Sequence, residues 1–116
     1  MNGIAKIEHC FYLIVPLQGR GELEVTISWE PIKNGVCHGA CHIHGCGIDV
    51  VLPAAGVDPI QTVLSAIHIM VVQFRIFEGN GFQMFSDDSY SSDARICSDL
   101  WVDTANQLFG SLTQKE

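Results

Sequence analysis

The stretch "ELEVTISWE", residues 22–30, decides the fold class, because apolar and polar side chains alternate along its whole length. Alternation with a period of two is typical of a β-strand that buries one face and exposes the other. The set predicted to point inward is Leu23, Val25, Ile27 and Trp29. The stretch therefore predicts a strand that lines one side of a hydrophobic core.

The segments on either side of this strand also have strand character. "CFYLIV", residues 10–15, is an apolar run of aromatic and β-branched types, and Pro16 ends it because proline has no N–H for a sheet ladder. "LQGRG" supplies the turn of a β-hairpin, since its two glycines accept positive φ. After the turn at "EPIKNG", residues 36–45 fit a third strand. Residues 48–52 fit a fourth strand or an irregular crossing before "PAAG" closes this half.

A long helix is the best-marked element of the chain. Asp58 suits the N-cap, Pro59 the first helical position, and Gln61 the third position of a capping box. One apolar face then follows helical spacing, with Gly79 as the stop: Ile60, Val63, Leu64, Ile67, Val71 and Phe74. A second apolar side carries Ile69, Val72 and Ile76. We therefore expect the C-terminal half of the helix to be covered on both sides, by the chain's own end or by another subunit.

The remaining segment is loop-like and then helical. Residues 79–94 are rich in glycine, serine and aspartate, with room for a short strand at residues 82–85. A second helix is predicted over residues 94–110, from Ile96, Leu100, Ala105, Leu108 and Phe109. Strands followed by helices indicate an α+β fold. We expect one domain, residues 1–116, in which an antiparallel β-meander of three to four strands packs against the long helix, with a second C-terminal helix.

Composition narrows the classes of partner. The net charge is −7, from 13 acidic and 6 basic residues, which disfavours nucleic-acid binding and favours a basic protein partner. Hydrophobic residues make up 47% and charged residues 16%, so a partner or a second copy is expected to cover some apolar surface.

The same sequence bears on the compartment. We find no run of ~18–20 apolar residues that would span a membrane, and no convincing signal peptide, which predicts a cytoplasmic protein without membrane contact. Five cysteines, an odd number, fit free thiols in a reducing compartment.

The stretch "VCHGACHIHGC", residues 36–46, concentrates three cysteines and three histidines. If it is extended, Cys37, Cys41 and Ile43 share the inward face, and the histidines share the outward one. Ordinary strand residues are the favoured interpretation, because cysteine is often buried without a metal. The alternative is a zinc site, and its ligands would be His38, His42, His44 and Cys46. Haem attachment and thioredoxin-like redox chemistry are disfavoured, because no Cys-x-x-Cys is present.

A run of aspartates is the other candidate site. It consists of Asp87, Asp88, Asp93, Asp99 and Asp103. It is interpreted either as a surface that binds a basic partner or a hard cation, or as an ordinary solvated loop and helix surface. The sequence contains no Gly-x-Ser-x-Gly, no phosphate-binding glycine loop and no His-Glu-x-x-His, which favours a role without catalysis.

Residues 41–70 resemble a family of small bacterial proteins known only as a domain of unknown function. That family's pattern is a strand ending in aromatic-x-Ile-x-Gly, then Gly-Val-Asp-Ala-Val-Gln-Ala-Leu and a long helix. The matching positions are Ile43, Gly45, Gly56, Val57, Asp58, Gln61 and Leu64, with Pro31 at a turn proline. The resemblance covers about half the chain and implies no activity. Cys41 and His42 depart from the aromatic or basic residues expected there, which argues against a metal site shared by the family.

These observations rank three functional hypotheses. The first is a small acidic bacterial binding protein without catalysis, in its most specific form an immunity-type protein that neutralises a basic toxin. The second is a metal-binding protein or metalloenzyme with zinc at the Cys/His cluster. The third is a structural homo-oligomer that associates through the long helix.

Overall fold

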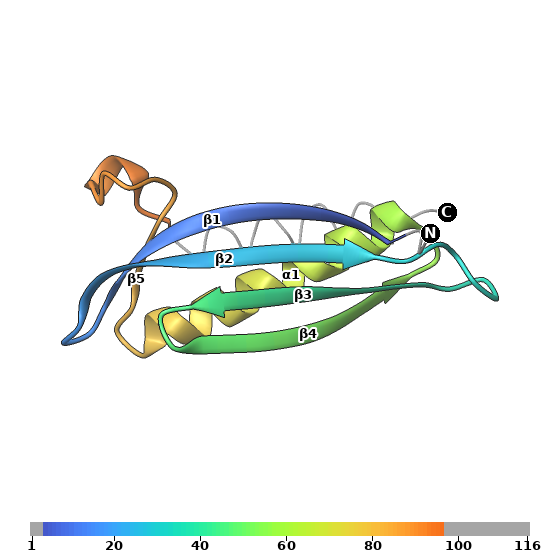
Figure 1. Ribbon diagram of the computed structural model, residues 1–116, viewed down its shortest axis with the longest axis horizontal. Coiled ribbons are helices and arrows are strands. Elements are labelled where there is room, and N and C mark those ends of the chain that lie inside the picture. The colour runs from blue at the N-terminus through green and yellow to red at the C-terminus, as the bar shows by residue number, and fades with distance from the viewer. Residues whose placement is uncertain (1–3, 97–116) are drawn as a thin grey trace, which may run out of the picture.

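The computed structural model describes residues 4–96, which form a five-stranded antiparallel sheet with one long helix against one face (Figure 1). The elements are β1 (Ala5–Val15), β2 (Gly19–Trp29), β3 (Cys37–Gly45), β4 (Ile48–Gly56), α1 (Pro59–Gly79), β5 (Gln83–Phe85) and a 3₁₀ turn, η1 (Ser92–Ala94). The strand order is β4-β3-β2-β1-β5. The predicted α+β class, with an antiparallel sheet on a long helix, is confirmed.

Three details differ from the predicted meander. The short strand for which residues 82–85 had room is present as β5, and it returns after α1 to the free edge of β1, with Met84 opposite Leu13, so the sheet has five strands rather than three or four. β4 continues through Pro53 as far as Gly56, which an edge strand tolerates because one side of its ladder is unpaired. The predicted second helix lies outside the described residues, apart from its first positions at residues 94–96.

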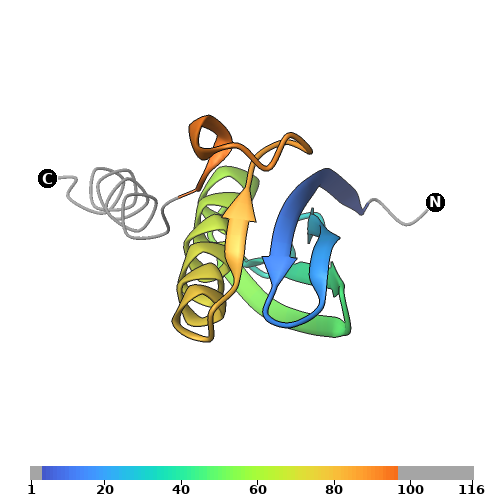
Figure 2. The ribbon, with the colours of Figure 1, turned by 90° about the vertical axis from the view of Figure 1, so that its left-hand side faces the viewer.

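The core lies between α1 and the face of the sheet that meets it. The alternation predicted for residues 22–30 is confirmed, since Leu23, Val25 and Ile27 are buried while Glu22 and Glu24 are exposed. β1 and β3 follow the same rule, and they place Leu13, Cys41 and Ile43 in the core. An end-on view shows α1 on one side of the sheet, and the opposite face carries no helix from the described chain (Figure 2).

The start of α1 is fixed as the sequence predicted. Asp58 is the N-cap, and its Oδ1 accepts a 2.8 Å hydrogen bond from the Gln61 N–H. The Gln61 side chain accepts from the Val57 N–H, one residue earlier than in a standard capping box. The buried Thr62 hydroxyl lies 3.0 Å from the Cys37 carbonyl oxygen and 2.8 Å from that of Asp58, so it can donate to either.

The face of α1 that meets the sheet overlaps only in part with the one predicted, from which Val71 and Phe74 are buried. The buried residues are Thr62, Ala66, Met70, Val71, Phe74 and Phe77. Ile60 is 69% exposed, and Val63, Leu64 and Ile67 are half-buried. The reason is steric: small residues at 62 and 66 let the helix approach the sheet closely. Apolar side chains cover more than half of the circumference of α1, so periodicity alone does not select which part of it is buried.

The apolar character of α1 has a second consequence. By length and composition it is the one helix of residues 4–96 that could cross a membrane, with a mean hydropathy of 1.5 over its best window. The core helix of a soluble protein passes the same test. One third of that window is buried against the rest of the molecule.

Candidate binding surfaces

The Cys/His stretch lies on β3, one strand in from the sheet edge, and alternation divides it as predicted. Cys37, Cys41 and Ile43 face the helix and are fully buried. The three histidines of the stretch are exposed on the opposite, outer face. Burial raises the pKa of the Cys41 thiol to about 11, and the four cysteines of residues 4–96 are free thiols.

The outer-face histidines interact with each other and with a carboxylate. The His42 Nε2–H lies 2.7 Å from Asp49 Oδ1, and this hydrogen bond lowers the pKa of Asp49. The rings of His42 and His44 are 5.9 Å apart, edge to face. His38 lies farther along β3, opposite Ala55 of β4. Two of the three histidines are therefore neighbours, and the third is separate from them.

Cys46 belongs to the other side of the sheet. It is the first residue of the two-residue turn between β3 and β4, where φ is 55° for Cys46 and 80° for Gly47, the signs of a type I′ hairpin. Its thiol donates to the Glu22 carbonyl oxygen at 3.2 Å and lies against Gly21, a helix-facing position of β2. Burial raises the pKa of this thiol.

The four candidate zinc ligands are thus not brought together. His42 and His44 lie on the outer face, His38 stands apart, and Cys46 packs toward the core. Within residues 4–96, no three His, Cys, Asp or Glu side chains are grouped so that they could hold a metal ion. Zinc binding remains a prediction.

The candidate aspartates lie on the segment between β5 and residue 96. Asp87, Asp88 and Asp93 are exposed there, and Asp99 and Asp103 lie outside the described residues. Asp87 accepts hydrogen bonds from the backbone N–H and the hydroxyl of Ser89, and the hydroxyl bond is the main cause that lowers its pKa. This carboxylate therefore also shapes a turn.

Tyr90 attaches this acidic loop to the outer face of the sheet. Its ring lies 5.4 Å from that of Phe85 and 6.2 Å from that of Tyr12, both of which occupy outer-face positions. Its hydroxyl donates to the Gly21 carbonyl oxygen at 3.1 Å, and the Arg20 guanidinium lies 4.5 Å from the centre of its ring. The loop carboxylates therefore border the carboxylates that the sheet itself carries.

Together these groups make one surface, which we call the acidic face. Its carboxylates are Glu8, Glu22, Glu24, Asp49, Asp87, Asp88 and Asp93. Its cations are engaged: Lys6 lies 3.3 Å from Glu8, Arg20 stacks on Tyr90, and Arg95 lies over Phe85. Sequence reasoning missed the strand carboxylates as a site. The signal that could have found them is the set of polar residues that alternate with the apolar ones along each strand. These polar residues point to one side of the sheet, so the carboxylates of neighbouring strands lie on one face.

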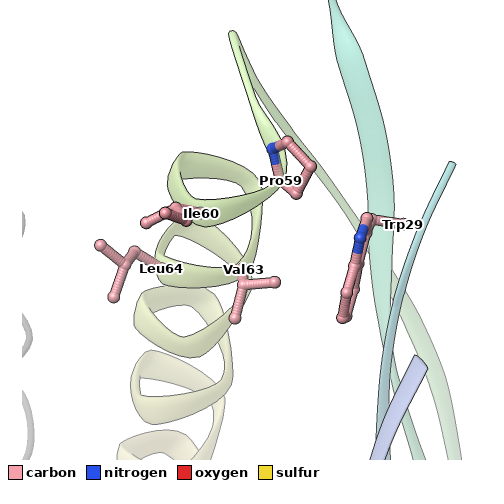
Figure 3. Close-up of a pocket in the computed structure, with 5 residues that line it drawn as sticks. All are labelled: Trp29, Pro59, Ile60, Val63 and Leu64. Carbon is pink, nitrogen blue, oxygen red and sulfur yellow. The ribbon is translucent and has the colours of Figure 1, made fainter. Parts of the chain in front are cut away.

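An apolar groove runs along the other face, between α1 and the first two strands. Its first part has a volume of about 240 Å³, and in Figure 3 Trp29 of β2 faces Pro59 and Val63 of α1 across it, while Ile60 and Leu64 form the far flank. Its second part, of about 150 Å³, is lined by Ile7, Glu8, His9, Phe11, Val25, Ile27, Ile67 and Met70. The two hollows share no lining residue, but Ile27 and Trp29, one from each lining, are consecutive helix-facing residues of β2. We call the whole the α1–β1 groove.

Comparison with protein-family models, with curated proteins and with solved structures finds no match to this chain. The resemblance of residues 41–70 to a bacterial family of unknown function therefore remains a prediction.

Proposed function

We propose that this protein is a small binding protein without catalysis, and that its partner is a basic protein held on the acidic face. The observation that carries this proposal is the distribution of charge on that face. Seven carboxylates lie on it or at its edge, and its three cations are already paired or stacked. The uncompensated charge is negative, which attracts a basic surface and speeds its encounter.

The shape of the acidic face supports the same conclusion. Four adjacent strands present it without a covering helix from the described chain, so a partner can lie flat against it (Figure 2). With the net charge of −7, this suits a protein that blocks a basic partner by covering it. The most specific form of the proposal is an immunity-type protein that neutralises a basic toxin.

Charge reversal on the acidic face tests the proposal. The full chain and a Glu22→Lys/Glu24→Lys variant are each immobilised and exposed to lysate of the native host at two salt concentrations. We expect the native chain to retain a basic protein stoichiometrically, and the variant to bind it about ten-fold or more weakly. Added salt should weaken the native complex, because it screens exposed charges.

Glu78→Lys is the control, since Glu78 lies near the end of α1, on the opposite side of the sheet from the acidic face. It changes the net charge in the same direction and should leave binding nearly unchanged. The proposal fails if no stoichiometric partner is retained, or if the retained protein binds the Glu22→Lys/Glu24→Lys variant as tightly as the native chain.

Zinc binding is the second candidate, favoured by one observation. His42 and His44 are neighbours on one face, with Asp49 hydrogen-bonded to His42. Imidazole and carboxylate are common zinc ligands, as in metalloenzymes. Elemental analysis of untagged protein, with a thermal shift on adding Zn²⁺, tests this candidate, because a bound ion stabilises the native state. Loss of that shift in His42→Ala but not in Cys46→Ser would locate the ion on the outer face. Zinc well below one equivalent, with no shift, would remove the candidate.

A further inference from the structure

The two edges of the sheet differ in what they offer to another strand. At the β4 edge, Gly45 and Ile48 flank a two-residue turn and are hydrogen-bonded to each other, so the odd-numbered residues of β4 point their backbone groups to the open side. Pro53 is one of these residues, and its missing N–H blunts the middle of that edge. At the other edge, β5 pairs only with residues 12–14 of β1. No strand of residues 4–96 covers residues 5–10 on this side, and we call this segment the free edge of β1.

The pairing of β1 with β2 orients the backbone groups of the free edge. The Glu30 N–H donates to the His38 carbonyl oxygen, so even-numbered residues of β2 bond toward β3 and odd-numbered ones bond toward β1. The register of β1 and β2 pairs odd residues with odd and even residues with even. Lys6 and Glu8 therefore point their N–H and C=O groups away from β2. Backbone groups in such a row are a template for an added strand.

The charges of the free edge suit a second copy of the same edge in one register. An antiparallel second copy can keep the backbone bonds with the two-fold axis at Lys6, at Ile7 or at Glu8. The axis at Lys6 places two ammonium groups opposite each other, and the axis at Glu8 does the same with two carboxylates, which destabilises both registers. The axis at Ile7 places Lys6 opposite Glu8 of the second copy. Both side chains are more than half exposed and can make this contact.

The register with its axis at Ile7 also brings apolar side chains together. Ile7 is 50% exposed on the helix-facing side, where it lines the second part of the α1–β1 groove. Because Ile7 bonds to β2, the two copies of this residue meet as a non-hydrogen-bonded pair, with Cα atoms about 4.5 Å apart. Side chains at that separation pack against each other across the strands. Charge and apolar contact therefore favour the same register.

From these observations we propose that the free edge of β1 binds the same edge of a second copy, antiparallel, with the two-fold axis at Ile7. Two five-stranded sheets then join into one, and Lys6 and Glu8 of both copies form a row of alternating charges on its outer side. A stable dimer buries roughly 800 Å² on each partner, more than one short edge supplies, so the dimer is weak, with a Kd of roughly 0.1–1 mM. The protein is then a monomer at micromolar concentration and pairs where it is concentrated.

Isotope-filtered NMR of the full chain tests the register. In a mixture of ¹³C-labelled and unlabelled chains at about 1 mM, Ile7 Hα should show an NOE to Ile7 Hα of the other molecule, since the Hα atoms of a non-hydrogen-bonded pair are in contact. If the strongest NOE from Ile7 to the other molecule goes to Ala5 or to His9, the axis lies at Lys6 or at Glu8 and the proposal is wrong. Absence of any NOE between molecules at Ile7 would overturn it as well.

Sedimentation equilibrium of charge variants tests the contact between Lys6 and Glu8. Glu8→Lys places like charges opposite each other in all three registers and should raise the Kd of self-association about ten-fold. The exchange Lys6→Glu/Glu8→Lys restores opposite charges across the axis at Ile7 and should return the Kd to within about three-fold of the native value. Far-UV circular dichroism verifies that each variant is folded.

Glu24→Lys is the matched control, because it makes the same change of charge on the outer face of β2, away from the free edge. It should not raise the Kd of self-association. Three results would each overturn the proposal: a native chain that stays monomeric at about 1 mM, self-association of Glu8→Lys as tight as native, or an exchange variant as weak as Glu8→Lys alone.

Discussion

At the scale of single residues, burial in the core is enough to explain why a cysteine stands at position 41, without a metal ion or a partner. It is fully buried in the core, and burial raises its pKa to about 11. Only the thiolate reacts with alkylating reagents, and at pH 8 about one molecule in a thousand would carry it. We expect Cys41 to stay unmodified by iodoacetamide in native protein and to react on unfolding in urea.

Peptide mapping by mass spectrometry after timed alkylation checks this expectation. Cys10, half-buried on the outer face, is the internal reference, and it should be modified before Cys41 under native conditions. Rapid native modification of Cys41 would mean that the strand opens locally, contrary to its place in the core.

The His42–Asp49 hydrogen bond predicts a pH effect at the outer face. This bond is the main cause that lowers the pKa of Asp49, so the ionised carboxylate is favoured in the folded state. The ionised Asp49 carboxylate therefore contributes to stability at pH values above its ordinary pKa of about 3.9. This contribution is lost as the pH falls through the lower pKa that Asp49 has in the folded protein. An NMR titration of the Asp49 carboxyl should give a midpoint below that ordinary value.

The control for this titration is His42→Gln, which removes the imidazole ring but keeps a polar side chain. We expect the Asp49 midpoint to move back upward in this variant. An unchanged midpoint would show that His42 is not the cause. Asp49 is exposed, so the measurement concerns the site and not the global stability of the protein.

At the scale of elements, the contact of β3 with α1 depends on a glycine. A Cβ on Gly39 would lie 2.5 Å from the Ser28 carbonyl oxygen and 2.8 Å from Thr62 Cγ2. Backbone cannot move aside cheaply, so we expect Gly39→Ala to lower the free energy of unfolding by about 1–3 kcal/mol. Urea denaturation measures this change.

Gly79→Ala is the matched control, because a Cβ there meets nothing within 4 Å and Gly79 ends α1. Alanine is the better helix former, so this change should be neutral or stabilising by up to about 1 kcal/mol. If the two variants unfold at the same urea concentration, the close approach of β3 to α1 is not a determinant of stability.

Elements were predictable where one local signal fixed them. The alternation of residues 22–30 and the Asp58-Pro59 cap depend on side chains adjacent in sequence, and both are confirmed. The buried face of α1 was predictable only in part, because apolar residues cover more than half of its circumference and the choice among them depends on where Thr62 fits against Gly39. β5 has three residues, and only its pairing with β1 across more than 60 intervening residues makes it a strand.

The candidate sites, too, were predictable only where a local sequence signal placed their residues. Strand alternation correctly separated the three histidines from Cys37 and Cys41. It could not place Cys46, which lies in the turn after the strand, where left-handed backbone sends its thiol toward Gly21. The acidic face was not predictable for a different reason: Glu24 is twenty residues from His44 and becomes its neighbour, and that of Asp49, only through the register of β2, β3 and β4.

At the scale of the whole molecule, charge and apolar surface are on opposite sides of the sheet. The outer side carries the carboxylates and histidines, and the groove lies on the other side. That other side is the one on which Figure 2 shows α1. A basic partner and an apolar partner would therefore not compete for one site. Covering one side leaves the other free, and the free edge of β1 lies between them, which allows the two proposals above to be tested independently.

The side of α1 that faces away from the sheet sets an expectation for the oligomeric state. Val72 and Ile76 are 42% and 52% exposed there, the surface from which a homo-oligomer was predicted. A stable dimer buries roughly 800 Å² on each partner, far more than two half-exposed aliphatic side chains supply. We therefore expect sedimentation velocity to show a monomer of 12.7 kDa at micromolar concentration. Val72→Asp/Ile76→Asp should leave both mass and melting temperature nearly unchanged, since each side chain is already half in water. A dimer in the native chain that dissociates in this variant would establish self-association through α1 instead.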